Sequence, residues 1–184
     1  MAFYGDTFTS DLTGTGSDDT REGALIRSGA KHTTSTITLN ANNTSASVNV
    51  FQVTGSVLVT SIHGEVLDAT TLTNCTAAYF DLYDGSAASV ITKATGAALS
   101  GFNVGAFFIK DEAIASILTV INNDQANVVE SSTNKASQPF ITIQKTGTDT
   151  FIRFNYATTD APINAQLKVD IHYADIDSGI VVAV

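Results

Sequence analysis

The segment from Gln166 to Tyr173 alternates between polar and apolar side chains at every position. Its apolar members, Leu167, Val169 and Ile171, share one side with the tyrosine, and the residues between them share the other. A period of two is that of an extended strand, whereas a helix repeats every 3.6 residues. The segment therefore predicts a strand with one dry and one wet face, in a sheet that packs on a second layer.

Strand signals of this kind recur at short intervals, separated by polar turns, across the rest of the chain. They cover residues 36–39, 47–53, 57–67, 76–84, 89–92, 104–110, 139–144, 151–156 and 180–184. The apolar pattern changes phase between Val50 and Phe51, which indicates a β-bulge or a strand buried on both faces. We predict an all-β protein with a single antiparallel β-sandwich or jelly-roll domain over residues 36–184.

Residues 111–121 allow two interpretations. Ile114, Ile117 and Leu118 fit one face of a helix that Asp111 would cap. The segment is also rich in β-branched residues, which favour a strand. In a chain with so many other strand signals, we favour the strand.

The first 35 residues differ from the rest, because Thr, Ser, Gly and Asp dominate residues 6–19. Such a segment buries too little apolar surface to order by itself, so it is either a flexible tail or an extended N-terminal arm that orders on a neighbouring subunit. We favour the arm, because Phe3, Tyr4 and Phe8 would serve no purpose on a free tail. The apolar end at 180–184 is expected to pair with a sheet or a neighbour. The candidate interaction residues are Phe3, Tyr4, Phe8, Leu25, Ile26, Val181, Val182 and Val184.

Charge and cysteine content restrict the function classes. The net charge is −9, and no two of the nine Lys and Arg residues are adjacent, which argues against nucleic-acid or membrane-surface partners. No apolar run approaches the roughly 18 residues of a membrane span. The single cysteine, Cys75, is expected to be a small buried residue. The first residues lack the basic and apolar regions of a signal peptide, so we expect no export by that route.

No catalytic signature is present, and we predict no catalytic residues, no cofactor and no metal. The three histidines, His32, His63 and His172, are far apart and lack metal-ligand spacing. His63 and His172 are expected on wet strand faces, and a triad assembled from distant residues stays the alternative. Asp81 and Asp84 are expected to be solvated turn carboxylates.

Two stretches carry a resemblance to a known family. Residues 51–66, which read FQVTGSVLVTSIHGEV, are similar to the strand pair that opens the β-domain in small virion proteins of tailed bacteriophages. Residues 167–184 resemble the closing part of these proteins, with an alternating strand, a tyrosine, a short Asp/Gly turn and a small apolar tail. The resemblance implies a structural role and carries no catalytic residues.

Four hypotheses follow. The first is a capsid decoration (cement) protein, made in the bacterial host cytoplasm and placed on the capsid surface of the virion. Its partners would be itself, as a homotrimer, and the major capsid protein or other virion proteins. The second is a tail-tip, baseplate or fibre component. The third is a carbohydrate-binding or adhesin module that uses exposed aromatics among Tyr79, Tyr83, Tyr156 and Tyr173, and a hydrolase is the least favoured.

Overall fold

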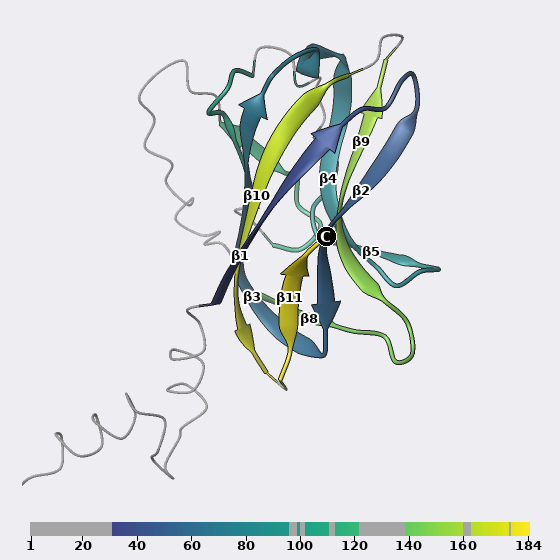
Figure 1. Ribbon diagram of the computed structural model, residues 1–184, viewed down its shortest axis with the longest axis vertical. Coiled ribbons are helices and arrows are strands. Elements are labelled where there is room, and N and C mark those ends of the chain that lie inside the picture. Colours follow the sequence, from purple (N-terminus) through teal and green to yellow (C-terminus); the bar gives the residue numbers. More distant parts are fainter. Residues whose placement is uncertain are drawn as a thin grey trace, which may run out of the picture.

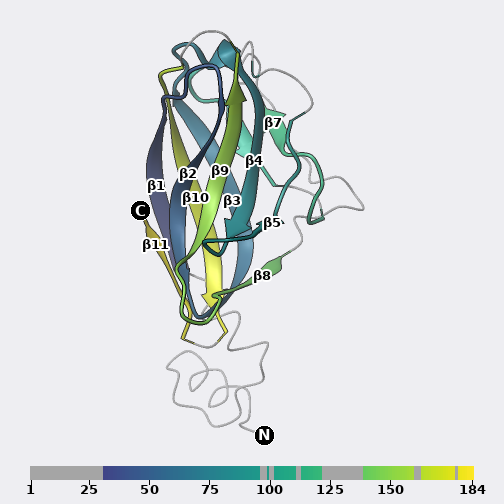
Figure 2. The same ribbon diagram turned by 90° about the vertical axis from the view of Figure 1, so that its right-hand side faces the viewer.

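The computed structural model describes residues 31–95, 99, 102–110, 113–121, 139–159, 163–176 and 178–184, with the backbone alone described at 120 and 121. Two antiparallel sheets pack face to face in this part of the chain (Figure 1). Turned by 90°, the sandwich is long and narrow, with most strands running along its length (Figure 2). The predicted all-β sandwich is confirmed, whereas the jelly-roll winding stays a prediction.

Each sheet combines strands from both ends of the chain. The first sheet has the order β1 (Lys31–Leu39), β10 (Ala165–Asp175), β3 (Ser56–Asp68), β6 (Phe107–Ile109) and β7 (Thr119–Ile121), while β8 (Phe140–Ile143) pairs with the start of β3. The second sheet has the order β11 (Ile180–Ala183), β2 (Ser45–Thr54), β9 (Thr150–Thr158), β4 (Cys75–Tyr83) and β5 (Ala88–Val90). A short 3-10 turn, Leu72–Asn74, precedes β4.

The core lies between the sheets and is centred on aromatic side chains. Phe154 of β9 packs edge-on against Phe80 of the neighbouring β4 at 5.3 Å and against Phe108 of the opposite sheet at 6.1 Å. All three rings are fully buried. Offset or edge-on ring pairs stabilise such a core beyond the area that they bury.

The strand β10 has the predicted two faces. Leu167, Val169 and Ile171 point into the core and are buried, whereas Gln166 on the other face is exposed. This face is not uniformly wet, since Asp170 is also buried.

The phase change in β2 is a bulge, as one of the two interpretations predicted. Asn49 pairs with Arg153 and Phe51 with Ile152, so Val50 is the extra residue in the ladder. Both Val50 and Phe51 are fully buried. One additional residue therefore turns two successive side chains toward the core.

Other boundaries differ from the prediction. β1 begins at Lys31, so residues 31–35, predicted as part of the arm, instead form the first half of this strand. Across the described residues 113–121 no helix forms, and the predicted strand is present only at its end, as β7 over 119–121; residues 113–118 form a turn with an isolated bridge at Ile117.

Candidate functional site

The C-terminal strand β11 places the predicted interaction residues in two groups. Val181 is buried against the core, whereas Val182 and Val184 are 52% and 61% exposed. Ile180, which is not among the predicted interaction residues, is also exposed. The strand pairs with β2 of its own sheet, so the apolar end is built into the domain and still presents an apolar outer row.

A backbone carbonyl of β11 is bonded to side chains from the other sheet. The carbonyl of Val181 accepts a hydrogen bond from Thr33 Oγ1 at 3.0 Å and one from the Tyr173 hydroxyl at 3.4 Å. A strand added at this position would compete with both bonds. The outer apolar row is therefore better suited to packing than to strand addition.

A second apolar row lies on β8, at the same end of the sandwich (Figure 1). Ile141 and Ile143 are 57% and 63% exposed. Ile141 pairs with Leu58 of β3, which is half-buried and extends the row. Among the described strands β8 pairs with β3 alone, so its second edge is a candidate for strand addition by a neighbouring chain. The sequence predicts a strand here, but its pattern does not single out these residues as an interaction surface.

The predicted contact residues of the N-terminal arm are Phe3, Tyr4, Phe8, Leu25 and Ile26. They lie outside the described residues, so their contribution to binding stays a prediction.

The three histidines, which are far apart in the sequence, come together on the outer face of the first sheet. His32 and His172 are direct cross-strand partners on β1 and β10, and their rings stack with centroids 4.5 Å apart. His63 on β3 stacks on the other side of His172 at 6.2 Å. The row therefore crosses three strands.

Asp170 lies beside this row and organises it. One carboxylate oxygen is 2.9 Å from His32 Nε2 and accepts a hydrogen bond from Thr34, and the other is 3.8 Å from His63 Nε2. Lys168 Nζ is 3.5 Å from the same carboxylate. The buried charge of Asp170 is thus surrounded by donors, as a buried carboxylate requires.

Burial and neighbours shift two pKa values in this cluster. Burial lowers the pKa of His63, and the nearby charges of His172 and Lys168 add to this effect against the opposing effect of Asp170. Burial alone would raise the pKa of Asp170, but hydrogen bonds from Thr34 and His32 and the charge of Lys168 outweigh it and lower the pKa. The cluster thus favours neutral His63 beside an ionised Asp170.

The histidine cluster does not reproduce the geometry of a catalytic triad at His32. A triad uses one ring nitrogen for the carboxylate and the other for the nucleophile. Here Asp170 and the Thr34 hydroxyl both approach Nε2, at 2.9 and 3.3 Å. Among the described residues, no group of three or more His, Cys, Asp or Glu side chains is arranged to hold a metal ion.

The two aspartates expected at turns have different roles. Asp84 does hold a turn, because its Oδ1 accepts hydrogen bonds from the backbone N–H groups of Ser86 and Ala87, which lower its pKa. The expectation for Asp81 was wrong. Its carboxylate is buried on the outer face of the second sheet and forms two hydrogen bonds with Arg153, at 2.9 and 2.7 Å.

Cys75 is buried and carries a free thiol, as expected for a small core residue. Burial raises the pKa of this thiol to about 11. A thiol with such a pKa is almost entirely protonated at neutral pH and is a poor nucleophile.

The four tyrosines proposed for glycan contact divide between the core and the surface. Tyr156 and Tyr173 are buried, and the Tyr156 hydroxyl accepts hydrogen bonds from the backbone N–H groups of Asn40 and Ala41. Tyr79 and Tyr83 are half-buried on the outer face of the second sheet. The Arg153 guanidinium lies 3.7 Å from the centre of the Tyr83 ring, and the Tyr83 hydroxyl donates a hydrogen bond to the Gly85 carbonyl. Of the four tyrosines, Tyr79 therefore remains available to a ligand.

Comparison with known proteins gives no match to this chain among protein-family models, curated proteins or solved structures. In the described part of the chain, no helix is long and apolar enough to cross a membrane.

Proposed function

We propose that this chain is a non-enzymatic structural protein of a virion, specifically a capsid decoration protein that assembles as a homotrimer and packs on the shell of a tailed phage. The observation that carries the proposal is the pair of exposed apolar rows on β8 and β11, with Ile141 and Ile143 on one and Ile180, Val182 and Val184 on the other. The resemblance of residues 51–66 and 167–184 to small phage virion proteins supports the choice of particle.

Apolar side chains gathered on strands at one end of a domain are typical of a surface that other protein covers. Burial of such a row contributes about 25 cal/mol per Å² of apolar surface, before the costs of association. One contact of this kind is weak, but a symmetric lattice repeats it many times, and the repeated contacts together stabilise the assembly.

The two rows suit two kinds of contact. On β11 the outer row packs by its side chains, because side chains from β1 and β10 already occupy the Val181 carbonyl. On β8 the edge that no described strand pairs with can also accept a strand from a neighbour. One row would form the contact between subunits of the trimer, and the other would form the contact with the capsid shell.

Light scattering on the purified full chain tests the assembly. The wild-type protein is expected at three times the 19.2 kDa of one chain. Val182→Asp places a charge in the outer row of β11 and is expected to give a monomer, because an unpaired charge cannot be buried at the contact without a large cost. Val90→Asp is the matched control, since Val90 is 45% exposed on β5 at the far edge of the same sheet.

A wild-type monomer at every concentration would contradict the trimer. A trimer that survives Val182→Asp would exclude the β11 row from the contact, and the same substitution at Ile143 would then test β8. Dissociation by Val90→Asp as strong as that by Val182→Asp would show a general effect of added charge.

A further inference from the structure

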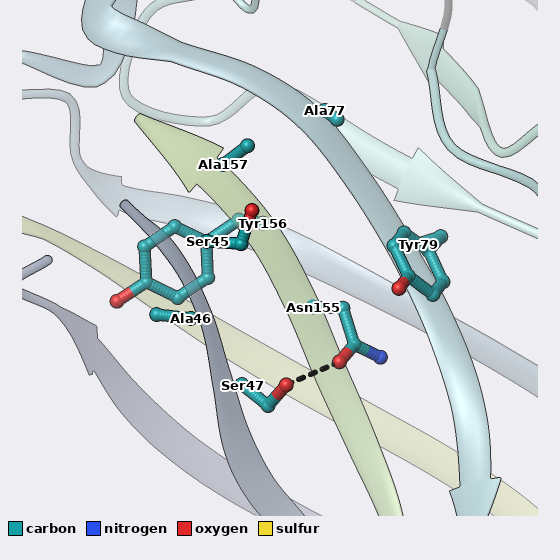
Figure 3. A pocket seen from close by; sticks show the side chains of 8 residues that line it. All are labelled: Ser45, Ala46, Ser47, Ala77, Tyr79, Asn155, Tyr156 and Ala157. Carbon is teal, nitrogen blue, oxygen red and sulfur yellow. Dashed lines mark hydrogen bonds between the residues drawn. The ribbon is translucent and has the colours of Figure 1, made fainter. Parts of the chain in front are cut away.

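The outer face of the second sheet contains a hollow of about 240 Å³ over β2, β9 and β4 (Figure 3). Its origin is a row of small side chains across the three strands. Ser45 pairs with Ala157, and Ala157 pairs with Ala77. Three small residues side by side leave the sheet uncovered at this point, which produces the depression.

The next row across the same strands is polar. Ser47 pairs with Asn155, and Asn155 pairs with Tyr79. Figure 3 shows the Ser47 hydroxyl joined to the Asn155 side-chain oxygen, with Tyr79 on the other flank of Asn155. The hollow thus has a methyl-lined floor with a hydroxyl, an amide and a phenol ring along one side.

Asn155 has an unused hydrogen-bonding group at this site. The side chain is 4% exposed, and its Nδ2 has no hydrogen-bond partner in the part of the chain that the structure describes. Buried amide groups are nearly always paired, so an unpaired one calls for an explanation. Because Nδ2 is itself buried, a ligand oxygen in the hollow would supply the acceptor once the amide or the Tyr79 ring rotates.

The lining selects the chemistry of the ligand. None of the described residues that line the hollow is charged, and Asp81 and Arg153, farther along β4 and β9, are paired with each other through two hydrogen bonds. The ligand should therefore be neutral. A hydroxyl group both donates and accepts, so it can satisfy either orientation of the Asn155 amide together with the serine hydroxyls.

The volume of the hollow and the ring of Tyr79 indicate the kind of neutral ligand that would fit. The volume lies below the roughly 300–1,000 Å³ of sites for drug-sized ligands, which leaves room for about one sugar ring. The hydroxyl of Tyr79 makes no hydrogen bond within the described residues, and its half-buried ring borders the hollow. A pyranose presents hydroxyls at its rim and C–H groups on its faces, and this lining matches both.

We propose that the hollow over β2, β9 and β4 binds a single neutral sugar residue, held by Ser47, Asn155 and Tyr79 over the floor formed by Ala77 and Ala157. This activity goes beyond the proposed structural function and does not depend on trimer formation. It requires Ser47 and Tyr79 to remain on a surface that solvent reaches.

NMR titration of the ¹⁵N-labelled full chain tests the site. The probes are glucose, galactose, mannose and N-acetylglucosamine, each up to about 50 mM, because a site of this size is expected to bind weakly. At least one of these sugars is expected to give saturable shifts in the Asn155 side-chain NH₂ signal and in the backbone amides around the hollow. Glycerol, an acyclic polyol, is expected to give none.

Two matched variants make the test specific. Ala157→Val fills the hollow without removing a polar group, suits a strand, and is expected to weaken sugar binding by about tenfold or more. Ala88→Val makes the same substitution on β5, at an exposed position of the same sheet outside the hollow, and should leave binding unchanged. Absence of saturable shifts with all four sugars, equal shifts with glycerol, or full binding by a folded Ala157→Val variant would each overturn the proposal.

Discussion

Gly179→Ala is expected to be among the most destabilising single-methyl additions in this protein. Gly179 is buried in the tight connection between β10 and β11. A Cβ atom at this position would overlap the backbone carbonyl oxygen of Ser56 and would lie 2.6 Å from a methyl group of Val57, which is itself fully buried. Neither neighbour can move aside by a simple change of rotamer.

The expected loss of stability can be worked out from the groups that a Cβ atom at position 179 would displace. Overpacking a buried position costs about 1–3 kcal/mol, and more when backbone must move. The Ser56 carbonyl also accepts a hydrogen bond from the Ile176 N–H at 3.0 Å, and loss of this bond adds about 1 kcal/mol. We therefore expect a loss of about 2–4 kcal/mol in the free energy of unfolding, which for a domain of this size lowers Tm by roughly 4–16 °C.

Gly64→Ala is the matched control. Gly64 is a buried glycine within β3, but a Cβ there would be 3.5 Å from its closest neighbour, the carbonyl of Lys168, which is an ordinary van der Waals contact. This substitution is expected to be neutral or to stabilise by up to about 1 kcal/mol, since it removes the backbone freedom of a mid-strand glycine.

Urea denaturation of both variants, with hydrogen exchange across β11, provides the measurement. If Gly179→Ala unfolded at the same urea concentration as the wild type and kept the β11 amides protected, the close approach of β11 to Ser56 would be refuted. Equal destabilisation by the two substitutions would refute the steric argument in the same way.

Three further predictions concern the charged and titratable groups. The free energy of unfolding is expected to fall as the pH drops below 6.5, the ordinary pKa of histidine, because burial lowers the pKa of folded His63 and the unfolded chain takes up its proton first. Urea titrations over this range should show that the free energy of unfolding of His63→Gln depends less steeply on pH than that of the wild type. At lower pH this variant should still lose stability as Asp170 becomes protonated, since the pKa of Asp170 is lowered in the fold. Asp81→Asn leaves the Arg153 guanidinium without its charge partner and should cost about 3 kcal/mol in the same assay. Alkylation of Cys75 at about pH 8 should be at least about a hundredfold slower in the folded chain than in urea, because burial raises its pKa to about 11; comparable rates would contradict its burial.

Features that depend on neighbours in the sequence could be predicted from the sequence. The alternation at 166–173 gave the two faces of β10, and the phase change at Val50 gave the bulge in β2, because side-chain direction in a strand is set residue by residue. The position of Asp170 on the wet face also followed. The burial of Asp170 could not be predicted, because it depends on Thr34 and His32 of β1 together with Lys168 of β10.

The clusters on the outer faces could not be predicted, because they depend on strand register between distant segments. His32 and Asp170 are 138 residues apart in the sequence, and Ser47 and Asn155 are 108 apart. A shift of one residue in either pairing would send one partner into the core. No local pattern in the chain fixes that register, so the histidine row and the hollow emerge only with the sheets in place.

The outer apolar row of β11 and the hollow lie beside opposite ends of β2. We therefore expect assembly and sugar binding to be independent of each other. Residues 51–54 of β2 pair with β11, whereas residues 45–47 border the hollow. Ser47 and Gln52 are five positions apart along β2, which is roughly 15 Å and beyond the range in which substitutions usually couple. Val182→Asp should therefore dissociate the assembly and leave sugar binding intact, while Ala157→Val should do the reverse. If Val182→Asp removed both activities without unfolding the chain, a sugar would bind only to the assembled form, and the hollow would be completed by a neighbouring subunit. If Ala157→Val removed both, the hollow itself would be part of the contact between subunits.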